Sequence, residues 1–118
     1  MNVQNKRKHF NHLDLIQKVG DDKIFIEFLH TTFSEGFEQY FEKIKNAFRL
    51  KDQNMLKNNA HTLKGSAYSA CFEILGDLIF EIEKMDVTQN EVYQELIPKI
   101  EKEKLLVNEA IKKFLGNP

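Results

Sequence analysis

Apolar residues recur every three to four positions along most of this 118-residue chain, and that spacing is the period of an α-helix. No convincing stretch alternates apolar and polar residues in the manner of a strand. Polar breaks around residues 20–22, 51–54 and 84–90 divide the helical pattern into segments. The pattern predicts helices over residues 11–19, 22–50, 52–70, 72–84 and 88–115.

The last four segments are long and their connections are short, which favours antiparallel packing of successive helices. The sequence therefore predicts an all-α fold, an antiparallel four-helix bundle of up-down-up-down topology with an additional short N-terminal helix. We expect one bundle domain over residues 11–116, preceded by a flexible N-terminal segment over residues 1–10.

Local signals predict several helix ends. Asp21 has the side chain of an N-cap, and Gly116 is typical of a helix C-terminus. Pro98 is expected to kink or split the last helix. The start of that helix is predicted to hold a capping box and a hydrophobic staple, formed by Thr88 with Glu91 and by Val87 with Val92.

The same periodicity predicts which side chains face the core. In the first helix these are Leu13, Ile16 and Val19. Gly36, inside the second helix, is expected at a close helix contact, because glycine costs a helix interior ~1 kcal/mol against alanine. The charged run over residues 101–104 is expected to be solvated. In the second helix the inward stripe is predicted to be Phe25, Phe28, Leu29, Thr32, Phe33, Phe37, Tyr40, Phe41, Ile44, Ala47 and Phe48.

Composition narrows the function classes. The formal net charge of −1 argues against a general nucleic-acid binder, which would carry a basic excess. No apolar run is long enough to span a membrane, and the N-terminus has no apolar signal region. The single cysteine, Cys71, allows no internal disulfide and no cysteine zinc cluster, so we expect a cytoplasmic protein.

Most catalytic motifs are absent, including glycine-rich phosphate loops, HExxH and GxSxG. Glu27 and His30 have the spacing of a di-iron ligand pair, but no second helix repeats it. His9 and His12 lie in the polar N-terminal segment. We therefore expect no metal site.

His61 stands apart from the other histidines. On a wheel of ~100° per residue it falls roughly 140° from the centre of its helix's apolar stripe, on the solvent face. Gly65 follows one turn later and lies nearly opposite the core, where packing does not require it. An exposed histidine beside an incidental glycine is one interpretation. The other is an imidazole cleared for the approach of a large partner.

The charged neighbours of His61 favour the second interpretation. Lys57 and Lys64 lie within about one turn of it, and nearby positive charge favours neutral imidazole, which keeps a nitrogen lone pair free as a nucleophile. The same ammonium groups would stabilise an attached phosphoryl group.

The run Ala60-His61-Thr62-Leu63-Lys64-Gly65-Ser66-Ala67 resembles the AHxLKGSA signature of histidine-containing phosphotransfer (HPt) domains. The resemblance extends over about residues 12–115. Gly20-Asp21 opening a long helix with Phe33 resembles the family's second helix, and residues 72–83 resemble its fourth.

The resemblance implies a phosphorelay intermediate rather than an enzyme with its own turnover. In such a relay His61 accepts a phosphoryl group through Nε2 from a receiver-domain aspartate and passes it to another receiver. Lys64 would neutralise phosphoryl oxygens and Gly65 would give the receiver access. No cofactor is expected on this chain, since the Mg²⁺ that assists transfer belongs to the receiver. The implied partners are receiver domains of hybrid histidine kinases and of response regulators.

The docking surface is expected to surround His61, with residues from three helices. Two positions depart from the family pattern. Cys71 stands where the family often has a glycine, and Tyr68 stands where it usually has a small residue. Three interpretations of Tyr68 stay open: its phenol contacts the receiver or the phosphoryl group, it restricts which receivers fit, or it is a partly exposed surface tyrosine without a role. The residues expected to bind the partner are Lys57, Asn58, Tyr68, Ser69, Leu15 and Ile24.

Other functions stay open at this stage. The chain begins with Met1 and carries no kinase or receiver segment, so we expect a stand-alone, monomeric carrier, with a domain of a larger hybrid kinase as the alternative. The competing functions are a receiver-docking or decoy adaptor without phosphotransfer and a structural bundle. A histidine kinase dimerisation domain fits poorly, because no ATP-binding segment follows.

Overall fold

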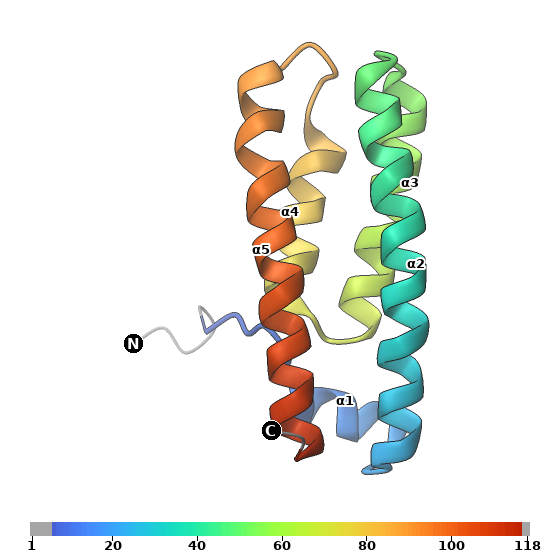
Figure 1. The fold of residues 1–118 in the computed structure, drawn as a ribbon, viewed down its shortest axis with the longest axis vertical. Helices are drawn as coiled ribbons and strands as arrows, with labels where there is room; N and C mark the ends of the chain where they lie inside the picture. Colours follow the sequence, from blue (N-terminus) through green and yellow to red (C-terminus); the bar gives the residue numbers. More distant parts are fainter. Residues whose placement is uncertain (1–5, 117–118) are drawn as a thin grey trace.

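The computed structural model describes residues 6–116, and this part of the chain folds into helices without strands (Figure 1). The predicted all-α bundle with a short N-terminal helix is confirmed. The helices are α1 (His12–Val19), α2 (Lys23–Arg49), α3 (Gln53–Ser69), α4 (Glu73–Lys84) and α5 (Asn90–Leu115).

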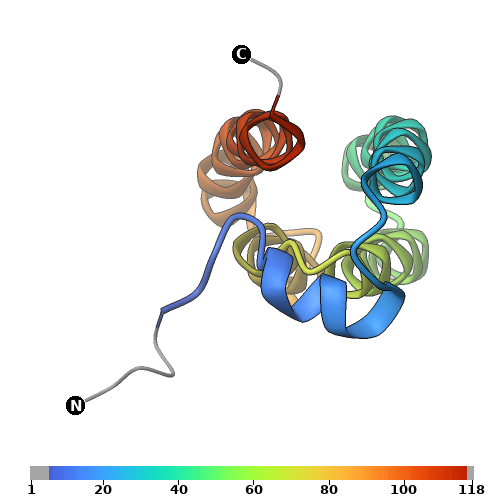
Figure 2. The ribbon, with the colours of Figure 1, turned by 90° about the horizontal axis from the view of Figure 1, so that it is seen from below.

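Consecutive long helices pack side by side, so that α2 contacts α3, α3 contacts α4 and α4 contacts α5. The bundle closes only weakly between α2 and α5. The short α1 crosses the end of the bundle beneath the α3–α4 connection (Figure 2), where the Asn11 N–H donates to the Cys71 carbonyl over 2.9 Å. The largest fully buried side chains include Phe72, Ile26, Ile44, Leu56, Leu63, Leu75 and Ile79.

Aspartates cap the N-termini of α2 and α3. Asp22, rather than the expected Asp21, accepts hydrogen bonds from the Ile24 and Phe25 N–H groups at the start of α2. Asp52 accepts from the Met55 N–H at the start of α3. These carboxylates satisfy amides that have no partner within the helix.

The predicted start of the last helix is wrong. The α5 helix begins at Asn90, with Gln89 rather than Thr88 at the N-cap position and without a side-chain cap, and the Thr88 hydroxyl donates to Asp86 over 2.6 Å. The expected partner Val92 is exposed. The helix continues unbroken through Pro98, whose ring lies on the exposed face and removes one backbone hydrogen bond without ending the helix.

Two expectations about facing residues also fail at the lower end of the bundle. In α1 it is Leu15 that is buried, whereas Leu13 and Val19 are exposed. In α2, Phe25 and Phe28 are exposed, because the first turns of α2 extend past the end of α3 (Figure 1). Thr32 is exposed as well.

The charged run in α5 is only partly solvated. Glu103 and Lys104 are buried, contrary to expectation. Glu103 Oε2 lies 2.5 Å from His9 Nδ1 of the N-terminal segment. The Lys104 ammonium donates to Asn108 Oδ1 and Ser34 Oγ. Each buried charge therefore has polar partners, as burial requires.

Residues 7–10 of the N-terminal segment contact the helical bundle. Arg7 makes a two-pronged ion pair with Asp77, at 2.9 and 3.0 Å. The Ile74 N–H donates to the Lys8 carbonyl, and Phe10 is buried against Phe72 and Phe114. The expected flexibility of residues 1–5 lies outside the described residues.

Replacing Phe10 with alanine tests this attachment. Because the ring is buried in an aromatic cluster, Phe10→Ala is expected to lower the free energy of unfolding by about 3 kcal/mol, the usual cost of truncating a buried phenylalanine. Urea denaturation measures it, with the exposed Lys6→Ala as the matched control. A change as small as that of the control would show that the segment does not pack.

Candidate functional site

The turn between α3 and α4 determines which side chains of the two helices face each other. Cys71 adopts φ +65°, a left-handed conformation that glycine reaches at less cost. Its buried thiol donates to Asp14 of α1 over 3.4 Å, so the side chain that strains the turn also joins it to α1. The departure at Cys71 therefore leaves a tight turn in place, with the Phe72 N–H donating to the Ala67 carbonyl.

Three contacts between α3 and α4 join residues that lie at equal distances before and after Phe72 in the sequence. His61 pairs with Glu83, Lys64 packs on Phe80, and Tyr68 covers Gly76. The members of each pair lie equally far from Phe72 along the chain, because both antiparallel helices rise by the same amount per residue.

A glutamate on α4 binds both His61 and Lys64, the candidate functional side chains of α3. His61 Nδ1 lies 2.9 Å from Glu83 Oε2, and Lys64 Nζ forms an ion pair with Glu83 Oε1 at 2.7 Å. The imidazole is 67% exposed, whereas the Glu83 carboxylate and the Lys64 ammonium are largely buried. The site thus combines an exposed His61 imidazole with a largely buried ion pair between Glu83 and Lys64.

The charge state of Glu83 assigns the tautomer of His61. Burial raises the pKa of Glu83, but the bonds from Lys64 and His61 outweigh it, and the pKa is lowered from its ordinary value. An ionised carboxylate only accepts hydrogen bonds, so Nδ1 must carry the proton that it receives. The Nε2 lone pair of neutral His61 then faces solvent, as a nucleophile requires.

Gly65 leaves open space on α3 one helical turn after His61. A Cβ placed on it would meet no atom within 4 Å. Of the other residues expected at this site, Lys57, Asn58 and Ser69 are exposed on α3. The sequence therefore located the exposed face of α3 correctly.

The Tyr68 hydroxyl is bound to α4. It donates to Asp77 Oδ1 over 2.7 Å, and Arg7 binds the same carboxylate. Burial and these bonds to Asp77 raise the pKa of Tyr68 to about 12. The ring lies where a Cβ on Gly76 would collide with it at 2.4 Å, so Gly76 provides the room for Tyr68.

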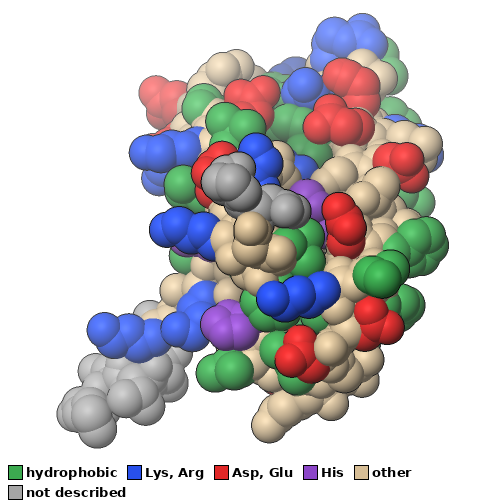
Figure 3. Space-filling view, turned by 60° about the horizontal axis from the view of Figure 1, so that its bottom comes forward, with side chains coloured by type: hydrophobic (Ala, Val, Ile, Leu, Met, Phe, Trp, Pro, Cys, Tyr) green, Lys and Arg blue, Asp and Glu red, His purple; other side chains and the backbone are tan. Residues whose placement is uncertain are grey.

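Two expected contact residues lie apart on the lower end. Leu15 is 3% exposed, so its assignment to an exposed docking surface is wrong, and its neighbour Leu13 is exposed instead. Ile24 is 82% exposed, as expected. Side chains of both charge signs are interspersed with hydrophobic ones on the end of the molecule seen in Figure 3.

The structure also bears on metals and membranes. Within residues 6–116, no group of three or more histidine, cysteine, aspartate or glutamate side chains is placed to hold a metal ion. His30 Nε2 lies 3.1 Å from Asn108 Oδ1. None of the helices described here has the length and apolar character needed to cross a membrane.

Comparison with known families identifies the bundle. A family model described as the Hpt domain matches residues 29–112, which is more than half of the chain. The chain belongs to the Hpt domain family. Hpt domains take part in histidine phosphotransfer within phosphorelays and interact with receiver domains of two-component systems. Searches of the curated proteins and of the solved structures find no match.

The sequence analysis of this Hpt domain missed Glu83. Its signal was available, because Glu83 lies as far after the α3–α4 turn as His61 lies before it. Using that signal requires the turn to be centred on Phe72, and the unusual Cys71 made the centre uncertain. Asp77 and Gly76, which hold Tyr68, were missed for the same reason.

Removing the Glu83 carboxylate is expected to change the tautomer of His61. At a pH where the imidazole is neutral, long-range ¹H–¹⁵N spectra of the wild type should show the proton on Nδ1, because Glu83 accepts it there. In Glu83→Ala the signal should shift toward the Nε2–H form that free histidine prefers. Glu81→Ala, an exposed glutamate on the same helix, is the control; equal spectra for all three proteins would contradict the assignment.

Glu83 also predicts a pH dependence of stability. Its folded-state pKa is lowered from the ordinary value of 4.5, so its stabilising contribution is present above that value and is lost as the pH falls through the folded pKa. The difference in unfolding free energy between wild type and Glu83→Gln should therefore be constant near neutral pH and shrink below about pH 4.5. Urea titrations across pH 3–7 measure it, and a difference that grows on acidification would refute it.

Proposed function

We propose that this Hpt domain is a phosphorelay carrier that accepts a phosphoryl group on His61 Nε2 from one receiver domain and passes it to another. The observation that carries the proposal is the exposed imidazole whose Nδ1 is bound by the shielded Glu83 carboxylate. That arrangement supplies an accessible nucleophilic nitrogen with its tautomer already selected.

The step is a displacement at phosphorus. The Nε2 lone pair attacks the phosphorus of an aspartyl phosphate, the P–N bond forms, and the P–O bond to the aspartate breaks, so the receiver recovers its carboxylate. His61 becomes positively charged during the attack while its Nδ1–H stays bound to Glu83. That carboxylate stabilises the developing charge without taking the proton. The reverse step delivers the group to the second receiver.

Lys64 supports the phosphorylated state. It lies three residues from His61, and its ammonium already sits 2.7 Å from Glu83 and 4.7 Å from the centre of the Phe80 ring. A phosphoryl group on Nε2 brings roughly two negative charges, which favours a shared position of the ammonium between Glu83 and the phosphoryl oxygens. Lys57 adds positive charge on the exposed face of α3.

The receiver supplies the rest of the chemistry in this proposal. Phosphoryl transfer depends mainly on positioning and charge neutralisation, and the Mg²⁺ that contributes to both is assigned to the receiver. The open space above Gly65 admits the receiver's aspartate. We further propose that the chain acts as a monomeric carrier without turnover of its own, in the cytoplasm, where its single free thiol suits a reducing compartment.

Transfer from a phosphorylated receiver tests the proposal. A panel of receivers is phosphorylated and mixed with wild type, His61→Gln or the control His12→Gln, and the products are separated on Phos-tag gels. Wild type and the control should acquire an acid-labile, base-stable phosphoryl group, and His61→Gln should acquire none, because it lacks the nucleophile.

Two outcomes would contradict it. A receiver that binds the wild type without transferring a phosphoryl group would identify a docking or decoy adaptor. A panel in which no receiver binds or labels the wild type would leave a structural bundle as the better description.

A further inference from the structure

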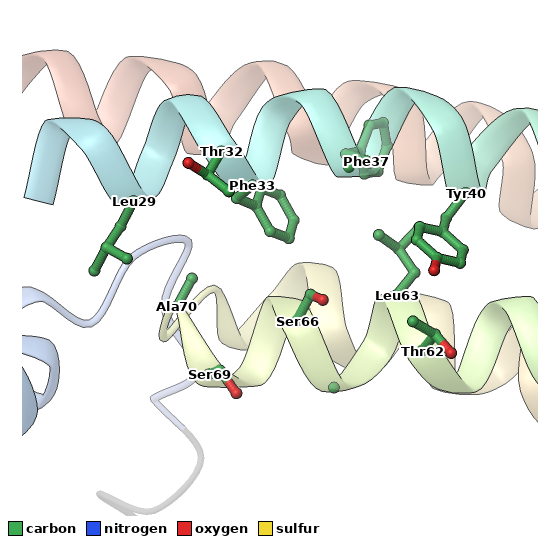
Figure 4. Close-up of a pocket in the computed structure, with 12 residues that line it drawn as sticks. Leu29, Thr32, Phe33, Phe37, Tyr40, Thr62, Leu63, Ser66, Ser69 and Ala70 are labelled. Carbon is green, nitrogen blue, oxygen red and sulfur yellow. The ribbon is translucent and has the colours of Figure 1, made fainter.

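A groove runs between α2 and α3 (Figure 4). Its volume is about 630 Å³, and none of its twelve lining residues is charged. The α2 wall is mostly aromatic and aliphatic, with Thr32 as its hydroxyl-bearing member, and the α3 wall is mostly small or hydroxyl-bearing, with Leu63 as its large aliphatic member. The other lining residues include Leu29, Phe33, Phe37 and Tyr40 on α2, and Thr62, Ser66 and Ser69 on α3.

A glycine stands in each wall of the groove. Gly36 lies in the interior of α2 and Gly65 in the interior of α3, and a Cβ on either would meet no atom within 4 Å. The expected close helix contact at Gly36 is therefore absent. Glycine weakens a helix interior relative to alanine, so nothing in the packing of this chain explains either residue.

The groove lies inside the area that a receiver must cover. Gly65 is one helical turn, about 6 Å, from His61, and Thr62 is its immediate neighbour. A protein interface of about 800 Å² per partner has a radius of about 16 Å when drawn as a disc. A receiver that brings its aspartate to Nε2 therefore reaches the mouth of the groove at the same time.

We propose that Gly36 is a specificity-determining residue, and that the receivers served by this chain insert an uncharged, apolar side chain into the groove between Gly36 and Gly65. The inference rests on the proposed function and adds a selection among receivers to it. Apolar chemistry follows from the uncharged lining, because a charged side chain would lose its hydration there without gaining an opposite charge. Two helix-interior glycines widen the space that this side chain enters.

Filling the groove separates docking from chemistry. Gly36→Leu places a large side chain in the groove, while Gly36→Ala fills it slightly and should raise the melting temperature, because alanine favours the helix and meets no atom. Thr31→Leu is the matched control, since Thr31 lies on the same helix but lines the gap toward α5. Each variant is loaded from phosphoramidate, a donor too small to need the groove, and from a phosphorylated receiver.

The expected result is a difference between the two donors. Gly36→Leu should load from phosphoramidate as wild type does, yet accept from the receiver at least tenfold more slowly at low receiver concentration. The control should match wild type with both donors. The inference would be overturned, and the proposed function left standing, if wild type and Gly36→Leu accepted from the receiver at equal rates. The same conclusion would follow if Gly36→Leu lost the same fraction of its loading rate with both donors. If no receiver loads the wild type, the proposed function fails and the inference falls with it.

Discussion

The left-handed turn at Cys71 is the constraint on which the site depends. Because α3 and α4 leave this turn in opposite directions, its centre fixes which residues of α4 stand opposite His61, Lys64 and Tyr68. A turn one residue longer would rotate Glu83 away from the imidazole. Glycine would adopt the same φ with less strain, but it would lose the buried thiol that contacts Asp14. The backbone strain at Cys71 is thus accompanied by a contact between its thiol and Asp14, which attaches α1 to the α3–α4 turn.

Glu83 links the stability of the hairpin to the tautomer of its exposed histidine, on which the proposed phosphotransfer depends. A largely buried carboxylate needs partners, and it finds them in Lys64 and His61. A hydrogen bond to the ionised carboxylate keeps the proton of neutral His61 on Nδ1 and leaves Nε2 unprotonated, so the same bonds that stabilise the buried Glu83 select this tautomer. The positive charge needed for a phosphoryl group is stored beside it, in the ammonium of Lys64.

Sequence periodicity predicted the helices and the exposed position of His61, because a 17-residue helix repeats its apolar stripe several times. It failed where the repeat is short or the partner is remote. The eight residues of α1 carry apolar side chains on both faces. For this reason Leu13 was wrongly predicted to face the core, and Leu15, which is buried, was wrongly predicted to be exposed. Glu103 is buried by the N-terminal segment, through His9. Thr88 does not cap the last helix, because α5 begins one residue later, with Gln89 at the N-cap position.

The glycines of the α2–α3 groove and the glycine under Tyr68 show two different uses of one residue type. At Gly76 a side chain would strike the Tyr68 ring, so packing within the chain explains the glycine. At Gly36 and Gly65 a side chain would meet nothing, and alanine would favour both helices. A position that gives up stability and leaves space unfilled is explained by something outside the chain. Since Gly65 lies one turn from His61, the simplest occupant of that space is the receiver that we propose exchanges a phosphoryl group with His61.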